Sequence, residues 1–206
     1  MAYSDFTLAK VRSSFNLTIK ETTELFDNLT SVEPSNRLIE TLTEGVPLAT
    51  AIATEKGKSE FIIAPILLEV KRRATSPVSI FSGTNFIVSP TKGLMGYCDF
   101  ILSSSEQQYI LTKPVVTIVE AKKDDISAGL GQCAAEMFAA QLFNSNEQTD
   151  CSPIYGVVTT GTVWKFLKLF DSTLYIDVSE YYIDRIDLLL AILLTTVAII
   201  PKSTLN

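Results

Sequence analysis

Glu120 and Lys122 stand two residues apart at the end of an apolar run, residues 115–119, and offer the clearest chemistry in the chain. Side chains alternate along a β-strand, so both of them point to the same face. A carboxylate beside an ammonium group can bind a hard cation and can hold or move a proton. Asp99, at the start of the strand-like run 96–102, adds a second carboxylate.

These residue types suit the hydrolysis of a phosphodiester. That reaction needs an oriented water, relief of negative charge on the phosphate and stabilisation of the leaving oxygen, and one or two divalent cations can provide all three. Mg²⁺ prefers oxygen ligands and is usually held by one or two protein carboxylates, a requirement that Asp99 and Glu120 meet. Lys122 would stabilise the nucleophile or help in proton transfer if cations lower its pKa. Lys123 points to the opposite face and is assigned no catalytic role, although it could touch a nucleic-acid backbone or face solvent.

The ordered set Asp99, Glu120 and Lys122, followed by Gln132 on a helix-like segment, resembles the PD-(D/E)xK nuclease superfamily, the restriction-endonuclease-like fold. The resemblance covers about residues 55–178. It implies a nuclease that depends on Mg²⁺ or Mn²⁺ and acts on nucleic acid, with DNA as the expected partner. The pattern departs from the family in one place, because no proline stands before the aspartate.

The resemblance also implies further members of the site. The main-chain carbonyl of Ala121 would be an additional metal ligand, and Gln132 would orient the lysine or the end of the substrate. Glu60 matches the acidic residue that many branches carry on the helix before the core sheet. Glu69 is a competing choice, and helical spacing does not decide between the two.

Composition limits the function classes. At 206 residues and 47% hydrophobic content, the chain is long enough for one well-buried domain. The absence of histidine removes histidine catalysis and disfavours zinc. Three cysteines, Cys98, Cys133 and Cys151, lack paired metal spacing and fit a reducing cytoplasm, where apolar filling is their ordinary role. A net charge of −6 counts against nucleic-acid binding unless basic residues gather on one face.

The remaining pattern predicts the elements that position these residues. Helices are expected at 35–43 and 55–73, the second with a kink at Pro65, and again at 126–143, with Asp124 or Asp125 as a possible cap. Strands are expected at 78–81 and 85–88 around a glycine turn, and at 97–102, 115–121, 154–160, 163–170 and 173–178. A last helix is expected at 183–199. This order indicates an α/β fold, a mixed sheet flanked by helices, with a restriction-endonuclease-like core.

Within a single domain, residues 1–54 are interpreted as a helical or irregular extension, 55–178 as the core and 179–206 as a closing helix and tail. The N-terminus lacks the features of a signal peptide, so a cytoplasmic protein is expected. The apolar run 188–200 is shorter than the roughly 17 to 25 residues that cross a bilayer, so no membrane partner is expected. A buried helix or a homodimer interface along 186–200 explains it better.

Three further features allow two interpretations each. Trp164 is expected in the core, although an aromatic face could stack on a base. The basic run 71–73 could meet phosphates or favour the negative end of its helix. Glu136, one turn after Gln132, is expected on a solvated helix face rather than in the site.

Two other functions compete with the nuclease. A catalytically silent module could use the same fold to bind nucleic acid or a protein partner, and the overall acidity favours it. A purely structural subunit would use Glu120 and Lys122 as a partly buried ion pair.

Overall fold

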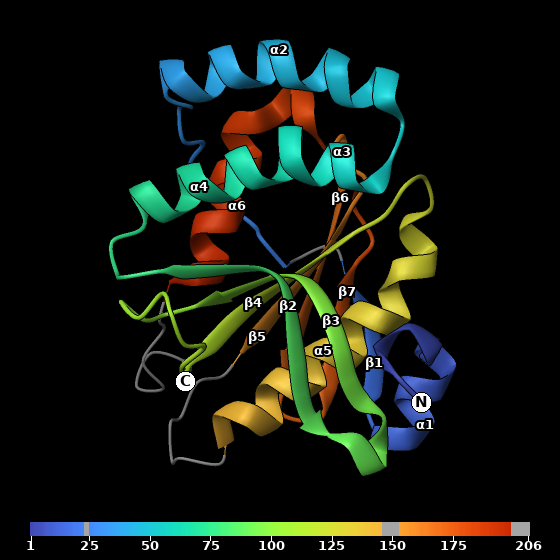
Figure 1. Ribbon diagram of the computed structural model, residues 1–206. Helices are drawn as coiled ribbons and strands as arrows, with labels where there is room; N and C mark the ends of the chain where they lie inside the picture. The colour runs from blue at the N-terminus through green and yellow to red at the C-terminus, as the bar shows by residue number, and fades with distance from the viewer. Residues whose placement is uncertain (23–24, 146–152, 199–206) are drawn as a thin grey trace.

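A mixed β-sheet between two layers of helices forms the centre of the molecule in the computed structural model, which describes residues 1–22, 25–145 and 153–198 (Figure 1). Its eight strands run in the order β1-β7-β6-β5-β4-β3-β2, with β8 paired to β6. The β1–β7 and β4–β5 pairs are parallel and the other pairs are antiparallel. The strands are β1 Thr18–Thr22, β2 Ser79–Ser89, β3 Leu94–Ser103, β4 Val115–Ala121, β5 Ile154–Thr159, β6 Val163–Phe170, β7 Thr173–Asp177 and β8 Tyr181–Tyr182. The expected α/β class is therefore confirmed.

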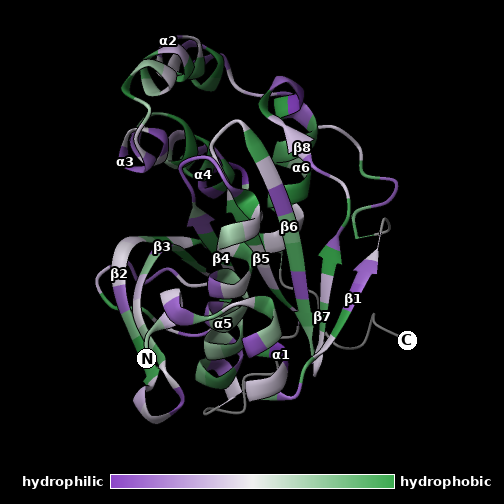
Figure 2. Cartoon of the chain, turned by 90° about the vertical axis from the view of Figure 1, so that its right-hand side faces the viewer, coloured by the Kyte–Doolittle hydropathy of each residue, from purple (hydrophilic) through white to green (hydrophobic). Residues whose placement is uncertain are grey.

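Helices cover both faces of this sheet. Helices α2, α3, α4 and α6 lie over one face, whereas α1 and α5 lie over the other, with α5 crossing β4 and β5 (Figures 1 and 2). The α-helices are α1 Leu8–Phe15, α2 Asn36–Ile52, α3 Glu55–Lys58, α4 Ala64–Arg73, α5 Ile126–Ser145 and α6 Ile186–Val197. Shorter helical turns are η1 Tyr3–Asp5, η2 Ser59–Ile63, η3 Pro90–Lys92 and η4 Ile183–Arg185. The sheet thus separates two hydrophobic cores.

The N-terminal segment, which lacks a clear period in the sequence, is built into the fold. Tyr3, Phe6 and Val11 are buried in the core between the sheet and α5. Strand β1 follows and pairs with β7, which makes it an edge of the sheet. Because β1 is short and polar, only this tertiary pairing identifies it as a strand.

The helix predicted at 35–43 starts as expected, because the Ser35 side chain accepts a hydrogen bond from the main-chain N–H of Leu38. Its predicted end is wrong, since α2 continues through Pro47 to Ile52. Leu38, Gly45 and Ala49 are buried along its inner face, so packing against the next helical segment extends the helix past the proline.

The helical course predicted at 55–73 is confirmed as α3, η2 and α4 in succession. The middle piece, η2, is a single π-helical turn that ends just before Pro65. Proline has no main-chain N–H and clashes with the preceding turn, so a wider turn at this point accommodates it.

The glycine turn predicted between 78–81 and 85–88 is wrong, because β2 is one continuous strand that pairs with β3 along its length. Gly83 lies in it with a φ of 58°, a left-handed conformation that glycine adopts without steric cost. The pairs Ser82–Phe100 and Thr84–Cys98 place Gly83 opposite Asp99. The glycine therefore bends the strand beside a candidate site residue.

The C-terminal apolar run is explained by packing within the chain. Leu189, Leu190, Ile192 and Leu193 of α6 are buried in the core under α2 and α4, and the end of the predicted run, 199–200, lies outside the described residues. Within the described part of the chain, no helix combines the length and apolar character that a membrane span requires.

Trp164 is fully buried and donates its indole N–H to the Gly161 carbonyl, which confirms the core interpretation.

Candidate active site

The candidate carboxylates belong to two adjacent antiparallel strands. The pairs Phe100–Val119 and Ile101–Ile118 fix the register of β3 against β4, and one step further this register sets Asp99 opposite Glu120. Side chains directly opposite in an antiparallel pair lie on the same face of the sheet. Asp99 Oδ2 also accepts a hydrogen bond of 2.8 Å from the main-chain N–H of Ala121, which fixes the carboxylate beside the end of β4.

Lys122 extends from this strand end along the face that α5 covers. Its Nζ lies 2.5 Å from Glu120 Oε1 and 3.3 Å from Gln132 Oε1. Its side chain is 19% exposed and that of Glu120 is 2% exposed, so the pair is largely removed from water. The structure therefore brings Asp99, Glu120, Lys122 and Gln132 together.

Room for the lysine comes from Gly129 on α5. A Cβ atom at this position would lie 2.6 Å from Val158 Cγ1 and 3.1 Å from both Cγ and Cε of Lys122. Any residue larger than glycine at position 129 would therefore clash with the aliphatic part of the Lys122 side chain.

We expect Gly129→Ala to displace Lys122. Overpacking of this kind costs about 1–3 kcal/mol of unfolding free energy, and an ångström-scale misplacement of a reacting group costs about ten- to a hundredfold in rate. Thermal unfolding and the rate of nucleic-acid cleavage measure the two effects. Ser127→Ala, at an exposed position of the same helix, is the matched control; equal behaviour of both variants would contradict the packing argument.

The sequence suggested that Glu136 lies on a solvated helix face. This prediction is wrong, because Glu136 is wholly buried beneath the site. Its Oε1 accepts a hydrogen bond of 3.0 Å from Gln132 Nε2. Helix α5 packs on the sheet and on α1, so both sides of the helix are covered and a residue one turn below Gln132 has no access to water.

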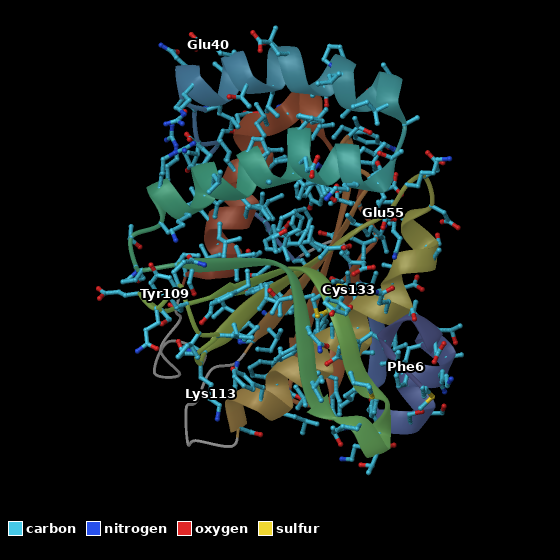
Figure 3. The ribbon with its side chains drawn as sticks, in the orientation of Figure 1. Phe6, Glu40, Glu55, Tyr109, Lys113 and Cys133 are labelled. Atoms are coloured by element: carbon cyan, nitrogen blue, oxygen red, sulfur yellow. The ribbon has the colours of Figure 1, made fainter. Side chains whose placement is uncertain are left out.

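The helical segment formed by α3, η2 and α4 carries acidic residues in two places: some line a cleft beside Asp99, and one lies outside it. Glu55 and Glu60 line a cleft of about 260 Å³ between this segment and the β2–β3 pair, and Asp99 and Gly83 line its opposite wall. Figure 3 shows Glu55 at the end of the helical layer next to the sheet, with Cys133 of α5 on the other side of the strands. Of the two acids left open by the sequence, Glu60 is therefore the one that lines the same cleft as Asp99, while Glu55 is an acid that sequence reasoning missed.

Glu69, the competing acid, lies outside this cleft. It is 2% exposed and binds Arg72 and Arg73 at 2.8 and 2.6 Å, and it also accepts the main-chain N–H of Ser35. Lys71 donates to Gln108 Oε1. The two arginines of the basic run 71–73 are therefore held by Glu69, a partner that neither interpretation of the run included.

Lys58 joins the helical segment to the loop that follows Lys122. Its Nζ donates to the main-chain carbonyl of Lys123 and lies 3.6 Å from Asp124 Oδ1, while its side chain is 14% exposed. This contact holds the helical wall of the cleft next to the end of β4.

Asp125, in the same loop, caps α5 by accepting the Ser127 N–H. It is one of the two residues expected from the sequence as a possible cap.

Burial and repulsion between carboxylates govern the electrostatics. Burial raises the pKa of Glu120 to about 8, and the negative charge of Asp99 adds to this effect, outweighing the opposing pull of Lys122. Burial also raises the pKa of Asp99, although the Ala121 N–H and Lys122 oppose it. Burial alone would lower the pKa of Lys122, but the charge and hydrogen bond of Glu120 raise it overall. Glu55 contributes to the shifts of both Glu120 and Lys122, which agrees with its place in the cleft.

A hard cation fits this donor set. Glu120 Oε2 is buried and has no hydrogen-bond partner among the described residues, so a cation that displaced the proton favoured by burial would satisfy this oxygen. In the same part of the chain, no group of three or more acidic or cysteine side chains could hold a metal ion by itself. Mg²⁺ commonly takes one or two carboxylates and fills its other positions with water and substrate oxygens, so Asp99 and Glu120 are the two residues that could hold it. The Ala121 carbonyl, between Glu120 and Lys122, stays a candidate ligand.

The cysteines add nothing to this donor set. Cys98 and Cys133 are buried free thiols in the core under α5, and Cys151 lies outside the described residues.

In comparisons with known proteins, the chain matches no family model, no curated protein and no solved structure.

Proposed function

We propose that this chain is a PD-(D/E)xK-type nuclease that hydrolyses phosphodiester bonds of nucleic acid, DNA in particular, with Mg²⁺ or Mn²⁺. One observation carries the proposal: the register of β3 against β4 sets Asp99 opposite Glu120, and Lys122 follows on the same face. The order along the chain also agrees with the resemblance, since an acid-bearing helical segment precedes the sheet and the Gln132 helix follows β4.

Each side chain has a separate task in this proposal. Asp99 and Glu120 would hold the cation, which when bound supplies positive charge against the phosphate and favours ionisation of water. Lys122 keeps an ammonium group next to the carboxylates, where it can attract the scissile phosphate and pass a proton. Glu55 and Glu60 form the opposite wall of the cleft beside Asp99.

The silent binding module is the second candidate, and a specific observation favours it. Three of the lysines around the cleft are already paired with acids: Lys56 with Glu60, Lys58 with Asp124, and Lys122 with Glu120. Such pairing leaves little positive charge for a phosphate backbone. This candidate expects the same fold without cation-dependent turnover.

The decisive experiment is a cleavage panel of linear, circular and single-stranded DNA together with RNA, in Mg²⁺, Mn²⁺ or a chelator, with wild type and Asp99→Asn. We expect cation-dependent cutting in the wild type. In the variant we expect cation affinity about tenfold lower, since removal of a carboxylate weakens a site built from two. A cation-induced rise in Tm reports that affinity without any substrate.

Asp184→Asn is the matched control, because it makes the same chemical change at an exposed position in η4. It should keep both the cutting and the rise in Tm. A wild type that binds the cation but cuts nothing would favour the silent module, and a wild type that does not bind the cation would remove the basis of the nuclease.

A further inference from the structure

Helix α5 contains a single charged side chain, Glu136, and buries it completely. Its neighbours Ala135, Met137 and Ala140 are buried apolar residues. Burying a carboxyl group among apolar residues costs free energy, and a leucine or methionine would fill the same space without that cost. The position therefore calls for an explanation in terms of what the carboxyl group contacts.

The contact is the carboxamide of Gln132. A carboxamide has an acceptor oxygen on one side and a donor nitrogen on the other, and its orientation decides which of them faces a neighbour. Glu136 Oε1 accepts from Gln132 Nε2 at 3.0 Å, which leaves Gln132 Oε1 facing Lys122 Nζ at 3.3 Å. Turned around, the amide would place its donor against the ammonium donors of the lysine.

We propose that Glu136 is a positioning residue for Lys122: it fixes the carboxamide of Gln132 so that the amide oxygen holds the lysine amine beside Glu120. The inference rests on the proposed nuclease for its effect on rate, but the contacts themselves do not depend on it. Four side chains then form one continuous hydrogen-bonded row, from Glu136 through Gln132 and Lys122 to Glu120.

The electrostatics of the row support this arrangement. Burial, reinforced by the nearby Glu120, raises the pKa of Glu136 well above its ordinary value. A protonated carboxyl still accepts a hydrogen bond through its carbonyl oxygen but adds no negative charge under the site. In that protonated form, Glu136 orients the amide without competing with Glu120 for the lysine.

The test compares Glu136→Gln, which keeps an acceptor at this position, with Glu136→Leu, which has none; Glu136→Met is the alternative if the leucine variant does not fold. The first readout is the NMR signal of the Lys122 ε-carbon in ¹³C-lysine protein, identified by its absence in a Lys122→Met sample. We expect a clear shift of this signal in the apolar variant and little change in Glu136→Gln. The second readout is the cleavage rate, which should fall about tenfold in the apolar variant and stay within about twofold in Glu136→Gln, the size of effect typical of residues that support a site.

A double-mutant cycle then separates positioning from stability. If Glu136 acts through Gln132, adding Glu136→Leu to Gln132→Leu should shift the Lys122 signal no further than Gln132→Leu alone does. Additive shifts, or equal shifts in the glutamine and leucine variants, would overturn the inference. A wild type that cuts no substrate would overturn the nuclease only, because the NMR comparison decides the positioning role without it.

Discussion

Lys122→Met should lower the rate of cation-dependent cleavage by at least about a hundredfold, because a positioned acid–base group contributes about 10²- to 10⁴-fold to a reaction. The methionine keeps most of the apolar stem that packs against Gly129 but removes the ammonium group. That group is the part of the side chain that contacts Glu120 and Gln132. Single-turnover cleavage at saturating cation measures the loss.

The same variant should still bind the cation. Removing a positive charge next to Asp99 and Glu120 leaves both carboxylates in place and relieves a repulsion toward Mg²⁺ or Mn²⁺. At a pH high enough to ionise Glu120, whose pKa Lys122 lowers in the wild type, the cation-induced rise in Tm should therefore be at least as large as in the wild type. Loss of cleavage together with an intact cation response separates the role of Lys122 from that of the carboxylates.

Lys123→Met is the matched control for charge. Lys123 is the next residue along the chain, its side chain is 63% exposed, and its nearest acid is Asp124 at 4.0 Å. A general contribution of positive charge to nucleic-acid binding would be lost equally in both variants and would shrink at higher salt. If Lys123→Met slowed cleavage as much as Lys122→Met, the assignment of Lys122 would be wrong.

The residues of the candidate site that lie on strands could be predicted from the sequence, because the alternation of side chains along a strand decides which of them share a face. Alternation along β4 places Glu120 and Lys122 on one face, and the antiparallel pairing of β3 with β4 in the structure brings Asp99 to them. Gln132 follows from the helix that starts after Asp125. Each of these placements involves only one strand, one pair of adjacent strands or one helix, so short-range patterns in the sequence are enough to suggest it.

Contacts between distant segments could not be predicted in the same way. Glu55 reaches the cleft only because the fold places α3 across that cleft from the β2–β3 pair, and nothing in its local sequence distinguishes it from Glu44 or Glu60. Edge strand β1 depends likewise on its partner β7. The burial of Glu136 did have a signal in the sequence, since a long helix with one charge and no polar face is expected to be covered along most of its length.

Glu69→Gln should lower the free energy of unfolding at pH 7 by roughly 2–3 kcal/mol, the largest stability effect that we expect from a single charge. Burial by itself would raise the pKa of Glu69, but hydrogen bonds from Arg73, Arg72 and Ser35 outweigh it and lower the pKa to about 2. Glutamine keeps the shape of the side chain and loses the charge that both arginines contact. The glutamine oxygen can still accept the Ser35 N–H, so the cap of α2 by the Ser35 side chain should be kept.

The pH dependence gives this prediction its sign. A carboxyl whose pKa is lower in the folded than in the unfolded protein stabilises the fold above its unfolded pKa, near 4.5, and loses that contribution as the pH falls toward 2. Urea unfolding of wild type and Glu69→Gln should therefore differ most at neutral pH and converge as the pH falls below about 4.5. Glu60→Gln, on the same helical course but with an exposed pair to Lys56, should change stability by less than about 1 kcal/mol at either pH. A difference between wild type and Glu69→Gln that stayed constant with pH would mean that packing, rather than the buried charge, holds α2 and α4 together.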